Sequence, residues 1–149
     1  MRTGDLVPDF TLPDQEGTPR SLTELLNGGS VVLFFYPAAM TAGCTKESCH
    51  FRDLAAEFSA VGATRVGISL DTVAKQKEFS DRHGFDYPLL SDESGEVAKF
   101  FGVKRPIGLL KVKRSTFIIG PDRTVLGTFT SETNMAAHAD QALALLRTR

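Results

Sequence analysis

The sequence predicts a three-layer α/β sandwich with a mixed central sheet and an N-terminal β-hairpin. Apolar runs typical of strands buried on both faces alternate with helix-like stretches between residues 31 and 101. Two more strand-like runs and an amphipathic helix complete the chain. The order is therefore a hairpin, then β-α-β-α-β-α, then β-β-α, which requires helices on both faces of one sheet.

The size and charge of the chain narrow its class. Its 149 residues, 42% hydrophobic and 23% charged, suffice for one core, so we expect a single domain over residues 1–149. A net charge of −1 gives no field that would hold nucleic acid or an anionic membrane. The longest apolar stretch, Val31 to Met40, is too short to cross a bilayer, and the N-terminus has no signal-peptide pattern. We expect a cytoplasmic protein with no nucleic-acid or membrane partner.

The first elements are bounded by turn and cap residues. The two prolines in residues 4–13 indicate an edge segment, and residues 18–21 are expected to return beside it as a hairpin. Ser21-Leu22-Thr23-Glu24 matches a capping box and predicts a short helix that ends at residues 27–29. The elements expected after this helix are strands at 31–36, 64–69, 87–90, 115–119 and 124–129, and helices at 41–60, 72–83, 93–101 and 135–147.

Several details of these later elements are also predicted. Asp71 is expected to cap the helix at 72–83, and Asp92 precedes the helix expected from residue 93. Residues 103–112 are expected to form a loop that contains Pro106 and Gly108. In the last helix His138 is expected at the surface, and the residues expected to face the core are Ala139, Ala142, Leu143 and Leu146.

Both cysteines lie where the first buried strand gives way to a helix. With Thr41 as N-cap, Cys44 falls in the first turn, where unpaired N–H groups and the helix dipole favour a thiolate. Cys49 is rotated by about 140° from Cys44, toward a more polar face. On an intact helix their Cα atoms would be about 8.6 Å apart, beyond the roughly 7 Å that a disulfide allows. Either the thiols never pair, or the helix unwinds to let them.

Two simpler interpretations of the cysteines stay open. Both could be half-buried small hydrophobes, although Gly43 allows a close backbone approach and Thr41 can aim a hydroxyl at the same point. Cys44, Cys49 and His50 supply metal-ligand types, but the spacing lacks a Cys-x-x-Cys chelate. We therefore expect neither a metal nor a cofactor.

The motif Pro37-x-x-x-Thr41-x-x-Cys44 resembles the active-site motif of the peroxiredoxins, and Cys49 makes it similar to the peroxiredoxin Q, or bacterioferritin comigratory protein, branch. The resemblance extends through most of the chain and implies a thioredoxin-like fold. One departure is Ala42, where the family commonly has proline. The flanking segments that carry the resemblance are residues 4–10, 67–71, 88–92, 101–103 and 114–119.

This resemblance implies a thiol peroxidase in which Cys44 attacks hydrogen peroxide or an organic hydroperoxide and becomes a sulfenic acid. Thr41 and the backbone N–H groups of Gly43 and Cys44 would bind the peroxide. Arg114 would secure the thiolate, and Pro37 would shield the thiol. Glu47 matches the acidic position of the family and would tether Arg114, with an exposed helix charge as the alternative. Without the motif, Arg114 would be interpreted as a surface charge at a strand edge.

By the same resemblance, Cys49 would resolve the sulfenic acid as an intramolecular disulfide, and thioredoxin or a glutaredoxin-like dithiol would reduce it. If Cys49 does not resolve, an external thiol attacks Cys44 directly. A thioredoxin-like thiol-disulfide oxidoreductase is the alternative enzyme, although it normally uses Cys-x-x-Cys. A non-enzymatic redox or metal-binding module is the third class.

The surface expectations are less specific. A monomer is expected, with the face near Pro37 and residues 103–112 as the place where a weak homodimer would form. The stretch from residue 104 to 114 is basic and is interpreted as a solvated loop, with docking of an acidic reductase as the alternative. Its cations are Lys104, Arg105, Lys111, Lys113 and Arg114.

Overall fold

The computed structural model describes residues 1–105 and 111–149, so the expectations for Pro106 and Gly108 lie outside the described residues. Strands β1 (Thr11–Pro13) and β2 (Pro19–Ser21) form an antiparallel hairpin, as predicted. The central sheet has the order β5-β4-β3-β6-β7. Its parallel strands are β3 (Ser30–Phe35), β4 (Ala63–Ser69) and β5 (Leu89–Ser91), and its antiparallel pairs involve β6 (Ser115–Ile119) and β7 (Val125–Thr130).

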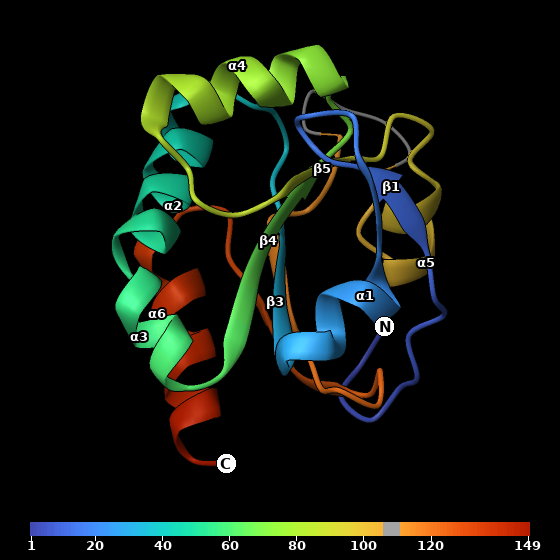
Figure 1. Cartoon of the computed structure of the whole chain (residues 1–149), viewed down its shortest axis with the longest axis vertical. Coiled ribbons are helices and arrows are strands. Elements are labelled where there is room, and N and C mark those ends of the chain that lie inside the picture. The colour runs from blue at the N-terminus through green and yellow to red at the C-terminus, as the bar shows by residue number, and fades with distance from the viewer. Residues whose placement is uncertain (106–110) are drawn as a thin grey trace.

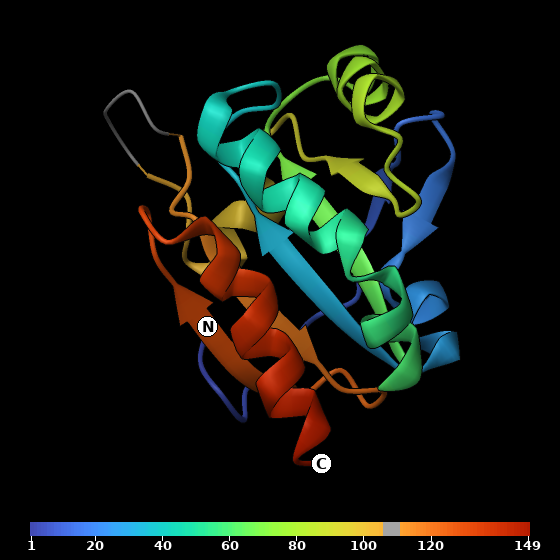
Figure 2. The same cartoon turned by 90° about the vertical axis from the view of Figure 1, so that its left-hand side faces the viewer.

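Helices cover both faces of this mixed sheet, which confirms the predicted three layers (Figures 1 and 2). One layer contains α2 (Ala42–Asp53), α3 (Ala55–Ala60) and α6 (Met135–Arg147), and α4 (Val73–His83) crosses the top of Figure 1. The other contains α1 (Leu22–Leu25), a short 3₁₀ turn (Leu26–Gly28) and α5 (Glu96–Phe101). No helix in the described ranges is both long enough and apolar enough to span a membrane.

Strand β3 separates the two halves of the core because its side chains alternate between the faces. Val31, Leu33 and Phe35 pack with the α1 and α5 side, whereas Val32 and Phe34 pack with α2, α3 and α6. All of these side chains are buried, so the continuous apolar run had correctly indicated a central strand. The end of β3 is therefore a fixed point from which the next loop and α2 begin.

The single helix expected from Thr41 to Ala60 is wrong, because the helix is interrupted at Leu54. Leu54 leaves helical geometry at φ −98° and ψ 24°, and its N–H bonds to the carbonyl of Phe51 at 3.3 Å. Arg65 of β4 donates from Nη1 to that same carbonyl at 2.9 Å. A buried guanidinium thus takes part of the hydrogen bonding that would continue the helix, and a tertiary contact of this kind has no local signal in the sequence.

Two predicted helix starts also need correction. The N-cap of α4 is Thr72, whose side chain accepts the N–H of Lys75, and Asp71 has another role. Helix α5 begins at Glu96 instead of Glu93. Asp92 still serves this helix, because its carboxylate accepts the N–H groups of Val97 and Ala98 from outside the first turn.

Candidate active site

The loop after β3 places Cys44 in the first turn of α2. This helix begins at Ala42, the position where the motif commonly has proline. Cys44 is a free thiol with 0% of its surface exposed. Gly43 is needed beside it, because a Cβ there would stand 3.3 Å from Nη2 of Arg114 and 3.0 Å from Cε of Met135. A side chain at residue 43 would therefore crowd the arginine that faces the sulfur.

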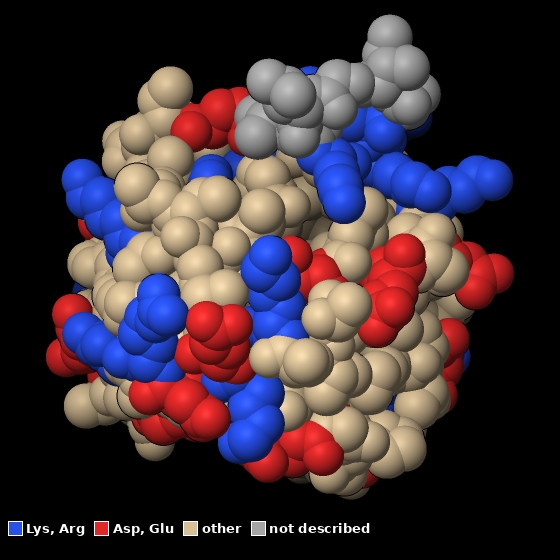
Figure 3. Space-filling model, turned by 90° about the horizontal axis from the view of Figure 1, so that it is seen from above, with Lys and Arg blue, Asp and Glu red and all other residues tan. Residues whose placement is uncertain are grey.

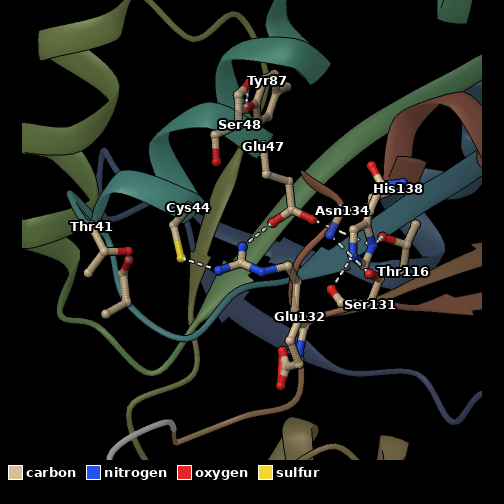
Figure 4. Close-up of polar contacts among 12 residues, drawn as sticks. Thr41, Cys44, Glu47, Ser48, Tyr87, Thr116, Ser131, Glu132, Asn134 and His138 are labelled. Atoms are coloured by element: carbon tan, nitrogen blue, oxygen red, sulfur yellow. Dashed lines mark hydrogen bonds and ion pairs between the residues drawn. The ribbon is translucent and has the colours of Figure 1, made fainter. Parts of the chain in front are cut away.

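Arg114 directly precedes β6, the antiparallel neighbour of β3, so the pairing of these two strands brings Arg114 close to the thiol. Its Nη2 donates to Sγ of Cys44 at 3.3 Å, and its Nη1 donates to Oε1 of Glu47 at 2.7 Å (Figure 4). Arg114 is only 5% exposed and Glu47 is fully buried, so the surface-charge alternatives for both residues are wrong. The planar guanidinium contacts the thiol and the carboxyl group at once.

A pocket opens beside this thiol and gathers most of the expected site residues. Thr41 is the N-cap of α2, but its hydroxyl donates to the carbonyl of Ala38 at 2.9 Å instead of closing the helix. The first N–H groups of the helix are therefore not taken by the cap side chain. The pocket is lined by Pro37, Ala38, Thr41, Gly43, Leu70, Asp71, Lys111, Arg114 and Glu132.

Cys49 lies farther along the same helix, and neither cysteine is among the residues that line the pocket, although Gly43 and Arg114 beside Cys44 are. Cys49 is a free, partly exposed thiol, and burial raises its pKa. Because α2 is continuous from Ala42 to Asp53, the two cysteines keep the helical spacing of about 8.6 Å between Cα atoms. A bond between them requires part of α2 to unwind.

Asp71, which was expected to cap α4, instead holds the loop before Cys44. Its Oδ2 accepts the N–H of Ala39 and the hydroxyl of Ser69, both at 2.7 Å. The loop also contains Met40 at φ 64°, a conformation that is uncommon outside glycine. The Asp71 carboxylate therefore fixes a loop of unusual geometry against the end of β4.

A buried polar group behind Arg114 was not predicted from the sequence. His138 of α6 is 0% exposed, so its expected surface position is wrong. Its Nδ1 lies 2.8 Å from Oγ1 of Thr116 and 3.5 Å from Oε2 of Glu47, and its Nε2 lies 2.8 Å from the carbonyl oxygen of Ser131 (Figure 4). The sequence feature that could have predicted this burial is the four-residue spacing of His138, Ala142 and Leu146, which puts all three on one face of the helix.

The side chain of Glu132 supports Arg114 by accepting a hydrogen bond from the Arg114 backbone. One carboxylate oxygen of Glu132 accepts the N–H of Arg114 at 3.0 Å, and the other accepts a hydrogen bond from Arg105. The solvated-loop interpretation is therefore wrong for Arg105 and Arg114. It holds for the exposed Lys104, Lys111 and Lys113. Figure 3 shows Lys and Arg side chains at the upper right of one face and also, interspersed with Asp and Glu, over other parts of it.

Burial shifts the pKa values of two groups behind Arg114, the carboxyl group of Glu47 and the ring of His138. It raises the pKa of Glu47 from 4.5 to about 8, although Arg114 opposes the shift. Burial also lowers the pKa of His138. Burial therefore favours the uncharged form of both groups, which would leave the positive charge of Arg114 to act on Cys44.

The raised pKa of Glu47 predicts a pH-dependent stability. The folded state holds this proton more tightly than the unfolded state, so the stabilisation is complete below about pH 4.5 and is lost as pH rises through about 8. Relative to the variant Glu47→Gln, the wild type should lose on the order of a few kcal/mol of unfolding free energy across this window. Urea unfolding of both proteins at several pH values measures the difference. If the unfolding free energies of the two proteins differed by the same amount at every pH, the raised pKa of Glu47 would be wrong.

The strand order and the helices on both faces form a thioredoxin-like fold. A thiol buried against a guanidinium, at the helix that follows the central strand of this fold, is the arrangement of a thiol-dependent redox enzyme. The chain matches the AhpC/TSA family over residues 3–127, and it belongs to that family. It is a thiol peroxidase related to the peroxiredoxin Q and bacterioferritin comigratory proteins.

Two solved structures share the fold of this chain over nearly its whole length, and a curated relative matches it in sequence. Peroxidoxin BcpB from Mycobacterium tuberculosis has 63% identity and a TM-score of 0.96, covering 99% of this chain and 97% of that one. The Xanthomonas campestris bacterioferritin comigratory protein has 31% identity and a TM-score of 0.89, with 99% and 98% covered. Chloroplastic peroxiredoxin Q of Arabidopsis thaliana is 39% identical over 147 residues, which are 99% of this chain and 68% of the relative.

Proposed function

We propose that the protein reduces hydrogen peroxide and organic hydroperoxides through Cys44. The thiolate attacks one peroxide oxygen, an S–O bond forms as the O–O bond breaks, and the leaving oxygen takes a proton to become water or an alcohol. The observation that supports this most is the 3.3 Å contact from Arg114 to the Cys44 sulfur. The Xanthomonas campestris relative is known for alkyl peroxide reduction, which is consistent with organic hydroperoxides as substrates.

The pocket supplies the other groups that this reaction needs. The N–H groups of Gly43 and Cys44 and the hydroxyl of Thr41 would hold the peroxide oxygens, while Pro37 limits water. Arg114 would stabilise the thiolate and the negative charge on the departing oxygen. Glu47 and Glu132 hold the arginine in place from two sides.

In the second half of the proposed cycle, Cys49 attacks the sulfur of the Cys44 sulfenic acid and releases water. The product is an intramolecular disulfide, which a thioredoxin-type dithiol reduces to restore both thiols. The helical spacing of the cysteines supports a step in which α2 unwinds first. This proposal assigns the reductant by its chemistry, as a dithiol that exchanges with an exposed disulfide.

A single-turnover reaction tests the whole proposal. The reduced protein is mixed with one equivalent of hydrogen peroxide, and free thiols and intact mass are measured over time. We expect both thiols to disappear with a loss of two hydrogens. One oxygen added to Cys44 with Cys49 still free would retain the peroxidase and reject the resolving role. Thiols that react no faster than free cysteine would reject the proposed function.

The hydroxyl of Tyr87 should slow the unwinding step. It is buried and donates to the carbonyl of Ser48 at 2.7 Å, next to Cys49 in the middle of α2. Removing one hydrogen bond of about 1 kcal/mol in Tyr87→Phe should make disulfide formation about fivefold faster, without changing the reaction of Cys44 with peroxide. The chain has no tryptophan whose fluorescence could report the step. Disulfide formation is therefore followed by quenching samples, alkylating the free thiols and measuring the intact mass.

Tyr36→Phe is the matched control for this prediction. Tyr36 is also buried, but its hydroxyl donates to Gln76 of α4 and not to α2. Equal rates of disulfide formation in the two variants would show that the Tyr87 hydroxyl does not restrain α2.

A further inference from the structure

We propose that His138 is a positioning residue for the thiol site, which keeps the carboxyl group of Glu47 uncharged and so leaves the charge of Arg114 for the Cys44 thiolate. His138 is not one of the residues that line the pocket, and it acts on the sulfur through Glu47 and Arg114 (Figure 4). The inference rests on the proposed role of Cys44, but it concerns a residue of α6 that the motif does not contain.

The hydrogen-bond partners of His138 determine where its protons lie. The carbonyl oxygen of Ser131 can only accept, so Nε2 of His138 carries a hydrogen and donates across 2.8 Å. In the neutral ring Nδ1 then presents a single lone pair, with Oγ1 of Thr116 at 2.8 Å and Oε2 of Glu47 at 3.5 Å as the two oxygens that can donate to it. Burial and the positive charge of Arg114 both disfavour a second ring proton.

This lone pair faces the carboxyl group of Glu47. Oε2 of Glu47 lies 3.5 Å from Nδ1 and has no hydrogen-bond partner among the described residues. An ionised Oε2 would be a buried, unsatisfied negative oxygen that faces a lone pair, which is costly. A proton on Oε2 removes this negative charge and can compete with the Thr116 hydroxyl for the lone pair, so His138 favours the neutral form of Glu47.

The charge of Glu47 in turn decides how much of the Arg114 charge acts on the sulfur. The guanidinium contacts both groups, and an ionised carboxyl 2.7 Å away would offset its charge.

The other titratable groups around Glu47 and His138 are Glu132 before α6 and Tyr87 before β5. Glu132 raises the pKa of Glu47 and of His138, and Glu47 raises the pKa of Tyr87. None of these replaces the lone pair of His138 at Oε2.

The test is the pKa of the Cys44 thiol, measured in a Cys49→Ser background by thiolate absorbance and by alkylation rate across pH. His138→Phe keeps a buried ring but removes the lone pair, so Glu47 should ionise at lower pH. We expect the midpoint of the thiol titration to rise by about one pH unit, and the alkylation rate to fall about tenfold at pH values well below that midpoint. His138→Asn, whose amide oxygen can replace Nδ1 as an acceptor, should restore most of this loss.

A double mutant separates this role from a merely structural one. Glutamine is an isostere of protonated glutamic acid and cannot ionise, so in a Glu47→Gln background the change His138→Phe should no longer shift the thiol pKa. An unchanged pKa in His138→Phe, or an equal shift with glutamate and with glutamine at residue 47, would overturn the inference. The titration uses no peroxide, so a failed peroxidase assay would leave this result interpretable.

If His138→Phe does not fold, the wild type still tests the inference. Nitrogen-15 spectra of the histidine rings should show His138 as the neutral tautomer protonated at Nε2 near neutral pH. A cationic ring, or a proton on Nδ1 in the neutral ring, would remove the lone pair from Glu47 and overturn the proposal.

Discussion

Replacement of Cys44 with serine is expected to slow peroxide reduction by at least about 1000-fold. The serine hydroxyl remains protonated beside Arg114 and is a far weaker nucleophile than a thiolate, so the pocket would keep its shape without its reacting atom. Cys49 remains in this variant, but the guanidinium of Arg114 donates to residue 44, and burial raises the pKa of Cys49. Peroxide consumption with a dithiol reductant, measured at several protein concentrations, gives the rate.

Cys49→Ser is the matched control, because it removes one thiol from the same helix and leaves the arginine contact intact. This variant should still react once with peroxide at the wild-type rate and accumulate an oxygen adduct on Cys44. Peroxide consumption that survives Cys44→Ser and is lost in Cys49→Ser would reverse the proposed roles of the two cysteines.

Local patterns were enough to predict most of the fold. The apolar run at β3 and the small and aliphatic stripe of α6 each depend on the burial of one short segment, which hydrophobic periodicity reports directly. The break at Leu54 was missed because it depends on Arg65, a residue of the next strand. Asp71 was misassigned for a similar reason, since a loop from another part of the chain competes for its carboxylate.

The site divides in the same way between local and long-range information. Cys44, Thr41 and Gly43 lie within one motif, and the resemblance to the peroxiredoxins added Arg114 and Glu47. The contacts of His138, Thr116, Ser131 and Glu132 arise where β6, β7 and α6 meet, and no short spacing in the sequence encodes them. A helical stripe can place His138 inside the fold, but only the three-dimensional structure identifies the carboxyl group it faces.

Arg114→Met should slow the reaction of Cys44 with hydrogen peroxide by about 100- to 1000-fold. Methionine is close to arginine in length and would fill the buried space, but it donates no hydrogen bond to the sulfur or to the departing oxygen. The thiol pKa should rise because the nearby cation is gone. Quenched single-turnover reactions at several peroxide concentrations measure the rate, and alkylation across pH measures the thiol pKa.

Two further variants show whether charge or geometry accounts for the Arg114 effect. Arg114→Lys keeps the charge, but one ammonium cannot reproduce the planar contacts to both Cys44 and Glu47, so an intermediate rate is expected. Lys113→Met removes an exposed cation next to Arg114 with the same change in net charge, and it should react like the wild type. A rate for Arg114→Met within about threefold of the Lys113→Met rate would mean that the 3.3 Å contact contributes little to the chemistry. Stabilisation of the thiolate would then have to come from the first turn of α2, where the helix dipole and the free N–H groups remain in every one of these variants.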